Sequence, residues 1–357
     1  MTKRTGKKIF RALIYLAGLI VIICIGFAIW IYHDLHAPVA HAKANDYIEI
    51  GRGSTPDGIA NRLMTEGVLR HKWPLLVYIK LTGSTKLLKA GEYRFPSPIT
   101  PLGVLKKLEE GEQRLSRFAL IEGWTRWDIA DSLAHVDELH LTDSGEALKL
   151  MDDTSEIRDL DPSAANLEGY LFPATYSFPT GTKASTIVDS MAKRFRQSWT
   201  PERAAKARAL NMTPRQIVII ASLIETEAKL KDERPLVASV IYNRLNKNVP
   251  LGIDSTIVYA SKLAGKWRND GRVYLSDVNR QSPYNTRLHA GLPPGPVGNP
   301  GEASIDAALN PAQTDYLYYV RNPDRDDGAH NFFSKESDFE KGVQALRQWE
   351  RSRPTPQ

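Results

Sequence analysis

The longest apolar run in the chain lies near its start, at residues 12–32. These 21 residues, ALIYLAGLIVIICIGFAIWIY, contain no charged side chain. As a helix rising about 1.5 Å per residue they would reach roughly 31 Å, which is enough to cross the hydrocarbon core of a bilayer. Trp30 and Tyr32 stand at the far end of the run, and aromatic side chains favour the membrane interface. The pattern therefore predicts a transmembrane helix.

A shorter alternation of apolar and polar positions predicts a small α+β module over residues 46–112. The segment DYIEI is typical of a strand. Ser54 or Thr55 can cap the helix that follows, and Pro56 suits its first turn. A second amphipathic helix, a strand and another Thr-Pro helix start follow, in KWPLLVYIKLTG, KLLKAGEYRF and TPLGVLKKLEEGE. The small and polar residues 33–45 predict a linker between the membrane span and this module.

The rest of the chain, residues 113–350, predicts a larger mixed α+β domain whose most apolar helix begins at Thr213. A threonine cap, a proline in the first helical position and a glutamine three residues after the cap mark its start. The next eight residues, IVIIASLI, include one polar side chain, so protein should cover this helix on all sides. Two acids follow, Glu225 and Glu227. At about 100° per residue they point to nearly opposite faces.

Three further segments of this domain predict loops. LEGYLFPATYSFP, residues 167–179, is rich in aromatics and suits either an ordered loop on the core or an aromatic platform for sugar rings. ERPLVASVIYNRL predicts a helix, and a loop containing Asp254, Ser255 and Thr256 comes after it. In residues 282–301, SPYNTRLHAGLPPGPVGNPG, the stretch 291–301 carries four prolines and four glycines, which predicts a stiff exposed loop.

Charge adds an orientation to this picture. The formal net charge is +6, yet the 42 basic residues after position 11 nearly balance the 41 acids. Five positive charges precede the span with no acid among them: Lys3, Arg4, Lys7, Lys8 and Arg11. The positive-inside rule places this tail, residues 1–11, in the cytoplasm and the rest of the chain beyond the membrane. Because the excess charge belongs to the tail, a nucleic-acid partner is not expected.

A cleaved signal peptide is the competing interpretation of the apolar run, because Ala40-His41-Ala42 loosely resembles a cleavage site. The run is longer than the roughly 7–15 apolar residues of such signals, and the site lies well beyond its end. An uncleaved anchor is therefore favoured. The only cysteine, Cys24, lies inside the span, so the exported part has no disulfide.

The acids that end the apolar helix have two interpretations. Exposure at a helix end is the ordinary state of such residues. Acids disfavour a helix C-terminus through the macrodipole, however, so two of them need compensation. A carboxyl group in an apolar wall has a raised pKa and can hold a proton at neutral pH, as a general acid for glycosidic bond cleavage must. The pattern alone leaves both readings open.

Taken together, the motifs resemble those of the membrane-anchored endolytic murein transglycosylases. The resemblance covers essentially the whole chain and rests on the N-terminal span and on these segments: EGWT (122–125), EGYLFPATY (168–176), ASLIETE (221–227), ER (233–234), VASVIYNRL (237–245), SPYNT (282–286), GLPPGPVGNPG (291–301), YLYYV (316–320) and GAHNFF (328–333). It implies a LysM-like module at 46–112, a catalytic domain at 113–350 and Glu225 in the catalytic position. It also implies a single-pass protein of the inner membrane with its catalytic domain in the periplasm.

The resemblance also suggests which residues contact substrate near Glu225: Glu227, Asn243, Asp254, Thr256, Tyr284 and Asn285. One loop departs from the family pattern, because residues 251–256 read LGIDST where a Leu-Gln-x-Asp-Pro-Thr run is usual. Ala174 stands where an acid is common. These departures concern the substrate contacts of the loop and leave Glu225 unchanged.

The implied chemistry needs one acid, whereas a glycoside hydrolase normally needs two carboxyl groups. Glu225 would protonate the oxygen between N-acetylmuramic acid and N-acetylglucosamine. It would then take the proton of the C6 hydroxyl group as a 1,6-anhydro ring closes. The resemblance implies no metal and no cofactor. It implies peptidoglycan strands as substrate, peptidoglycan synthases as possible partners, and termination of nascent strands as the role.

Two alternatives stay open at this point. A muramidase-type hydrolase would use Asp254 as its second carboxylate. A non-catalytic scaffold would bind glycan through the first module and recruit synthases to the membrane.

Overall fold

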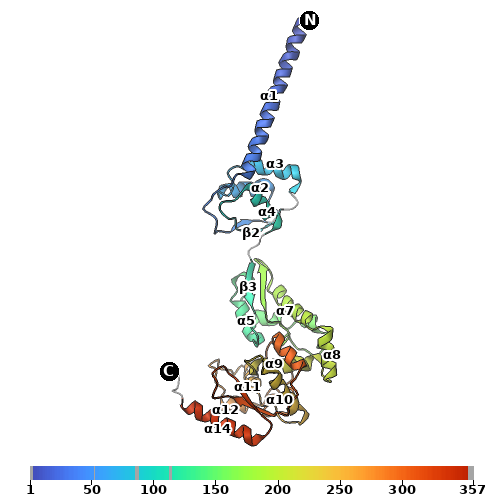
Figure 1. Ribbon diagram of the computed structural model, residues 1–357, viewed down its shortest axis with the longest axis vertical. Coiled ribbons are helices and arrows are strands. Elements are labelled where there is room, and N and C mark those ends of the chain that lie inside the picture. The colour runs from blue at the N-terminus through green and yellow to red at the C-terminus, as the bar shows by residue number, and fades with distance from the viewer. Residues whose placement is uncertain (1–2, 52, 85–87, 112–114, 353–357) are drawn as a thin grey trace. The chain divides into compact units, whose positions relative to one another are not determined.

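The computed structural model describes residues 3–51, 53–84, 88–111 and 115–352. The chain divides into two compact units, Met1–Ser116 and Arg117–Gln357. Each combines helices with short two-stranded sheets (Figure 1), which confirms a mixed α+β architecture. The expected boundary after residue 112 lies outside the described residues, as do the charged side chains of the basic tail at residues 3–9 and 11.

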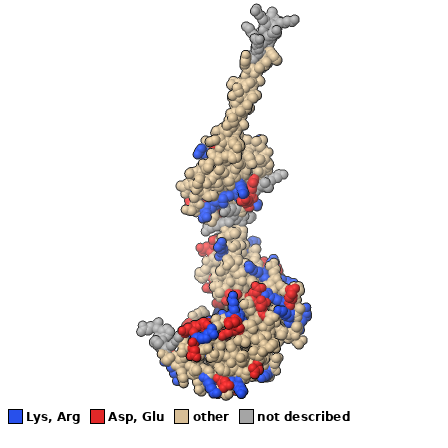
Figure 2. Space-filling view, in the orientation of Figure 1, with Lys and Arg blue, Asp and Glu red and all other residues tan. Residues whose placement is uncertain are grey.

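The first unit begins with the long helix α1, Lys3–His36. Its stretch Leu13–His36, 24 residues, is long and apolar enough to cross a membrane, as expected. Figure 2 draws the apolar length of this helix without charged side chains. The finding is consistent with membrane anchoring.

The segment 33–45, expected as a linker, differs from that expectation. Helix α1 continues to His36, where Leu35 is buried, and the backbone of Val39 pairs with that of Ile99. The backbone N–H of His41 donates a hydrogen bond to the hydroxyl group of Ser97. The reason is that the segment carries apolar residues among its small and polar ones, and the module buries them.

The rest of the first unit has the expected strand-helix-helix-strand order. Its elements are β1 (Ile48–Ile50), α2 (Pro56–Thr65), α3 (Trp73–Thr82), β2 (Gly91–Tyr93) and α4 (Pro101–Glu110). The two strands pair antiparallel, and the hydroxyl groups of Thr55 and Thr100 cap α2 and α4. The caps explain why these short helices begin where the Thr-Pro pairs predict.

The second unit contains the remaining elements: β3 (Leu115–Ala119, which crosses the division between the units), α5 (Arg126–Ala134), η2 (Asp137–Leu139), α6 (Ser144–Leu150), η3 (Ser155–Ile157), β4 (Thr175–Pro179), α7 (Ala184–Ser198), α8 (Pro201–Ala209), α9 (Pro214–Glu227), α10 (Arg234–Asn246), α11 (Asp254–Leu263), α12 (Leu275–Val278), α13 (Glu302–Leu309), β5 (Tyr318–Arg321), β6 (His330–Phe333) and α14 (Glu336–Ser352). Strand β3 pairs with β4, and β5 pairs antiparallel with β6.

Helix α9 is the centre of this unit. It packs against α8, α10, α11 and α13, and every residue from Ile217 to Ile224 is buried. The threonine cap at Thr213 forms the capping box that the sequence predicts. The expectation of a helix covered on all sides is therefore confirmed.

Two local expectations are wrong. Residues 254–256, expected in a loop, form the first turn of α11. Residues 175–179, expected as loop or platform, form strand β4, whose Tyr176 and Phe178 point into the core. In both places the periodicity of a short apolar segment gave no clear signal, and tertiary packing decided the structure.

A close approach of three segments fixes the loop beside α9. Gly169 has a φ of +84°, and a Cβ atom there would lie 2.5 Å from the Pro296 side chain and 2.9 Å from that of Val218 on α9. Only glycine accepts both the left-handed backbone and the contact. The turn at residues 167–171, the loop 291–301 and α9 are thus pressed together.

Candidate active site

Glu225, the expected catalytic acid, is held from two sides near the end of α9. Its side chain is 5% exposed. Its Oε1 atom accepts a hydrogen bond of 2.9 Å from Nη2 of Arg234, and its Oε2 atom accepts one of 2.8 Å from the backbone N–H of Gly301. Both carboxylate oxygens are therefore engaged by donors.

The expectation of an apolar wall around Glu225 is wrong. Arg234, itself buried, is the first residue of α10, and Gly301 is the N-cap of α13. The carboxyl group thus meets the guanidinium group of Arg234 and lies at the N-terminus of α13, whose macrodipole presents partial positive charge. This arrangement supplies the compensation that an acid at a helix C-terminus needs.

A second carboxyl group shares this environment. The Oε2 atom of Glu122 lies 3.8 Å from Nη2 of Arg234. A Cβ atom added to Gly301 would lie 2.0 Å from the Oε1 atom of Glu122. The Glu122 side chain is 51% exposed, so solvent and ligands reach it. The guanidinium group of Arg234 therefore stands between a buried acid and an open one.

Glu122 was not predicted as a site residue, although it is the first residue of the EGWT segment. The available signal was an acid before a glycine turn: Gly123 has a φ of +81°, and a Cβ atom there would lie 3.7 Å from Cγ of Glu225. Hydrogen bonds between Gly123 and Asn299 and between Trp124 and Asn299 fix this turn against the proline-rich loop.

A buried glutamate, Glu168, supports the same turn and was also missed. Its carboxyl group accepts hydrogen bonds from the backbone N–H of Arg126, the hydroxyl group of Tyr259 and the amide of Asn299. The side chain is almost fully buried, and this burial raises its pKa from 4.5 to about 7. An acid that changes charge near neutral pH thus lies behind the active-site turn.

We expect replacement of Glu168 by glutamine to flatten the pH dependence of stability. The pKa of Glu168 is higher in the folded state than its ordinary 4.5. Its contribution is therefore most favourable below about pH 4.5 and declines as the pH rises to about 7, by roughly 3 kcal/mol. Urea unfolding of wild type and Glu168→Gln at pH 5 and pH 8 measures the difference.

Glu202→Gln provides the control for this prediction, because Glu202 is exposed. That variant should follow the wild type at both pH values. Equal pH dependence of wild type and Glu168→Gln would contradict the assignment of the titration to Glu168.

An open hollow of about 190 Å³ adjoins Glu225. It is lined by Gly123, Thr125, Asp128, Thr226, Ser255, Val258, Tyr259, Lys262 and Val297. Thr226 directly follows the candidate acid, and its hydroxyl group hydrogen-bonds that of Ser255 on α11. The hollow is therefore a place where a ligand can lie against the turn before α5.

Two of the expected substrate contacts are acids on the other side of α9. Glu227 accepts a hydrogen bond of 2.9 Å from the Tyr319 hydroxyl group, and burial raises the pKa of Glu227. Asp254 is exposed and forms an ion pair of 2.6 Å with Arg287. The carboxyl group of Asp254 is thus paired with a guanidinium group at the surface.

Two other expected contacts hold loops together. The hydroxyl group of Thr256 bonds with Thr286 and with the carbonyl of Ile253, and Thr256 is fully buried. The amide of buried Asn285 donates to the carbonyls of Val278 and Arg280. These two side chains shape the wall of the site and are not available to substrate.

Asn243 and Tyr284 also have structural partners. The amide of Asn243 donates hydrogen bonds to the carbonyls of Thr314 and Tyr316, which fix the approach to β5. The ring of Tyr284 lies 4.8 Å from that of Tyr259, between centroids. Both residues are only partly buried, and Tyr284 adjoins the hollow through Tyr259, which lines it.

Comparisons with known proteins place this geometry in a family. The model of the YceG-like family matches residues 48–345. The endolytic murein transglycosylase of Bacillus subtilis strain 168 is 33% identical over 294 residues, which cover 78% of this chain and 79% of that protein. The endolytic murein transglycosylase of Streptococcus pneumoniae strain D39 is 30% identical over 327 residues, but this chain spans only 59% of its length.

A solved structure agrees with these relatives. The crystal structure of a yceG-like protein from Listeria monocytogenes shares 31% sequence identity with this chain and superposes with a TM-score of 0.58. The alignment covers 84% of this chain and 99% of that one. The family match spans both units and includes every residue of the Glu225–Arg234–Glu122 arrangement. The chain therefore belongs to the YceG-like family.

Proposed function

We propose that this protein is an endolytic murein transglycosylase, which cleaves glycan strands of peptidoglycan internally without consuming water. The observation that carries the proposal is the enclosed carboxyl group of Glu225, held by Arg234 and Gly301 beside an open hollow. The names of the relatives from Bacillus subtilis and Streptococcus pneumoniae support the same substrate.

In the proposed reaction Glu225 first donates a proton to the oxygen between N-acetylmuramic acid and N-acetylglucosamine. The bond from this oxygen to C1 breaks, and the C6 hydroxyl oxygen of the same muramic acid bonds to C1. Its proton returns to Glu225, so the acid is regenerated. Arg234 and the Gly301 N–H stabilise the carboxylate form that exists between the two transfers, because both donate hydrogen bonds to it.

The membrane helix gives this activity a place. With the basic tail in the cytoplasm, the anchor of α1 holds the catalytic unit in the periplasm, beside newly made strands. The first unit acts as a LysM-like glycan-binding module. In this setting cleavage terminates strand elongation, and synthases of peptidoglycan are the expected neighbours. In this proposal residues 46–112 form the glycan-binding module and residues 113–350 form the catalytic domain.

A hydrolase is the second candidate, and Glu122 favours it. A retaining or inverting hydrolase needs a second carboxyl group near the acid. Asp254 is paired with Arg287, whereas Glu122 is half-exposed and shares Arg234 with Glu225. If the protein were a muramidase, Glu122 would be its second carboxylate.

Product analysis separates these two functions. We expect digested peptidoglycan strands to carry 1,6-anhydro ends, lighter than hydrolysed ends by one water molecule, when examined by mass spectrometry. We expect the same products with Glu122→Gln and with Asp254→Asn, because a transglycosylase needs one acid. New reducing ends that incorporate oxygen from labelled water, and that vanish with Glu122→Gln, would establish the hydrolase instead.

A further inference from the structure

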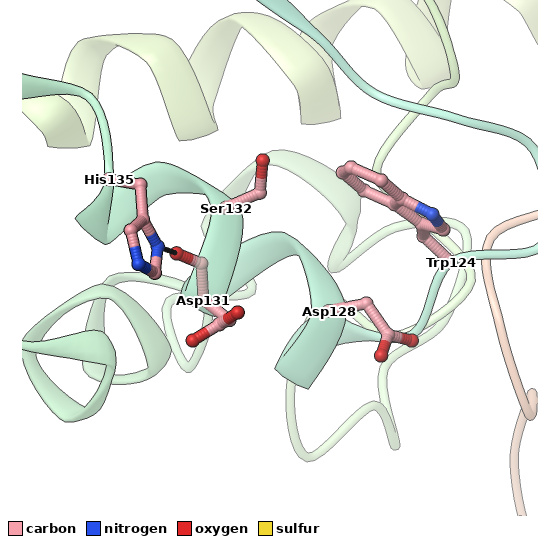
Figure 3. Close-up of a pocket in the computed structure, with 5 residues that line it drawn as sticks. All are labelled: Trp124, Asp128, Asp131, Ser132 and His135. Atoms are coloured by element: carbon pink, nitrogen blue, oxygen red, sulfur yellow. Dashed lines mark hydrogen bonds between the residues drawn. The ribbon is translucent and has the colours of Figure 1, made fainter. Parts of the chain in front are cut away.

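A large hollow lies along one face of α5, outside the immediate surroundings of Glu225. Its volume is about 620 Å³, within the range of roughly 300–1,000 Å³ that small-molecule sites occupy. Its lining is Trp124, Asp128, Asp131, Ser132 and His135. Figure 3 shows these side chains along α5, from Trp124 before the helix to His135 at its end.

The spacing of the lining residues explains why they form one surface. Asp128, Asp131, Ser132 and His135 are three or four positions apart, so they share a face of the helix. Trp124 comes from the turn just before the Thr125 cap. The hollow is therefore built by a single helix and its N-terminal turn.

The hollow adjoins the active site through a shared residue. Asp128 also lines the smaller hollow beside Thr226, which follows Glu225. Lys262 and the capping threonine, Thr125, already occupy both carboxylate oxygens of Asp128. A strand lying in the smaller hollow would therefore meet the face of α5 at Asp128.

The chemistry of the hollow favours a ligand that donates hydrogen bonds. Within the described part of the chain, neither the carboxylate of Asp131 nor the hydroxyl group of Ser132 has a hydrogen-bond partner. The Nδ1 atom of His135 donates to the carbonyl of Asp131 (Figure 3), which leaves Nε2 as an acceptor. The lining has no unpaired cation, so an anionic ligand is disfavoured.

An aromatic face completes the set. Trp124 is partly buried against the core and borders the hollow. Tryptophan offers a rigid apolar face beside polar groups, which suits a ligand with both apolar and hydroxyl-bearing sides. Amino sugars have apolar C–H faces and donate hydrogen bonds from hydroxyl and acetamido groups.

We propose that the α5 hollow is a distal saccharide subsite, which holds a sugar unit of the strand that Glu225 cleaves. This inference rests on the proposed function and extends it. A sugar stacks on Trp124, and its hydroxyl groups donate to Asp131 and His135. A strand that extends past Asp128 fills this subsite and a fragment that ends before it does not, so the subsite favours cleavage of longer strands.

The test compares the full chain in detergent with two variants, Asp131→Ala/His135→Ala and Ser132→Trp. Substrates are long glycan strands, with and without stem peptides, and the shortest fragment that the wild type cleaves. We expect the ratio of kcat/KM for long strands to that for the fragment to fall about tenfold in the first variant, because charge-assisted hydrogen bonds are lost. The Ser132→Trp variant should lower this ratio at least as much, because its bulky side chain fills the hollow.

Asp137→Ala is the matched control, since Asp137 is an exposed acid just beyond α5 that does not line the hollow. It should keep the wild-type ratio. An unchanged ratio in both hollow variants, with circular dichroism intact, overturns the subsite. A loss seen only with strands that carry stem peptides overturns it as well, because the hollow would then bind a peptide amine.

Failure of the proposed function gives a different result. If the wild type cleaves neither long strands nor fragments, the transglycosylase assignment fails. The subsite is then judged by sedimentation of the full chain with peptide-free strands. Weaker sedimentation of both hollow variants, but not of Asp137→Ala, supports it, and equal sedimentation overturns it.

Discussion

Glu225→Gln is expected to abolish strand cleavage, with a loss of about 10³-fold or more in kcat. Removal of a general acid typically costs about 10² to 10⁴-fold, and in the proposed reaction Glu225 serves both proton transfers. Glutamine keeps the shape but only one acceptor oxygen, so only one of the two donors, Arg234 or the Gly301 N–H, keeps its hydrogen-bond partner. The measurement is release of anhydro-ended fragments from purified strands, with thermal unfolding as the check on folding.

Glu227→Gln is the matched control, because Glu227 lies two residues along the same helix. Its carboxyl group bonds with Tyr319 rather than with Arg234. Since it faces away from the hollow, this variant should keep cleavage within about tenfold of wild type. Equal losses of kcat in the two variants would contradict the assignment of Glu225 as the catalytic acid. Full rescue of a deletion strain by Glu225→Gln would favour the non-catalytic scaffold.

The fold was predictable wherever capping and periodicity agree. Thr55, Thr100 and Thr213 each begin a helix as expected, because a hydroxyl cap and a following proline act locally. The Asp254 turn was not predictable, since α11 has no side-chain cap and its first turn follows a glycine with positive φ. Its helix depends on packing against α9 and α12.

The site was predictable only in part, for a physical reason. Glu225 stands out because an acid after an almost wholly apolar run is costly without partners. Those partners come from distant segments: Arg234 from the next helix, Gly301 from a loop 76 residues away and Glu122 from the turn before α5. Sequence spacing gives no measure of such distances. For the same reason the burial of Thr256 and Asn285 was not foreseen.

Arg234→Met is expected to be the most destabilising single change in the site. The ion pair with Glu225 is buried, with 8% and 5% of the two side chains exposed. Removing one partner of a buried pair leaves the other charge unpaired, which typically costs about 3–5 kcal/mol. For a unit of this size the melting temperature should fall by about 10 °C, as circular dichroism of the full chain in detergent would measure.

Arg287→Met supplies the comparison, because its pair with Asp254 has 46% and 60% of the two side chains exposed. Exposed pairs contribute about 1 kcal/mol or less, so this variant should melt within about 3 °C of wild type. The double variant Glu225→Gln/Arg234→Met should recover part of the loss, since no buried charge then lacks a partner. If the double variant melts as low as the sum of the two single changes, the pair is not coupled. Arg234 would then stabilise the unit through packing of α10 alone, and the carboxylate of Glu225 would need another source of positive potential.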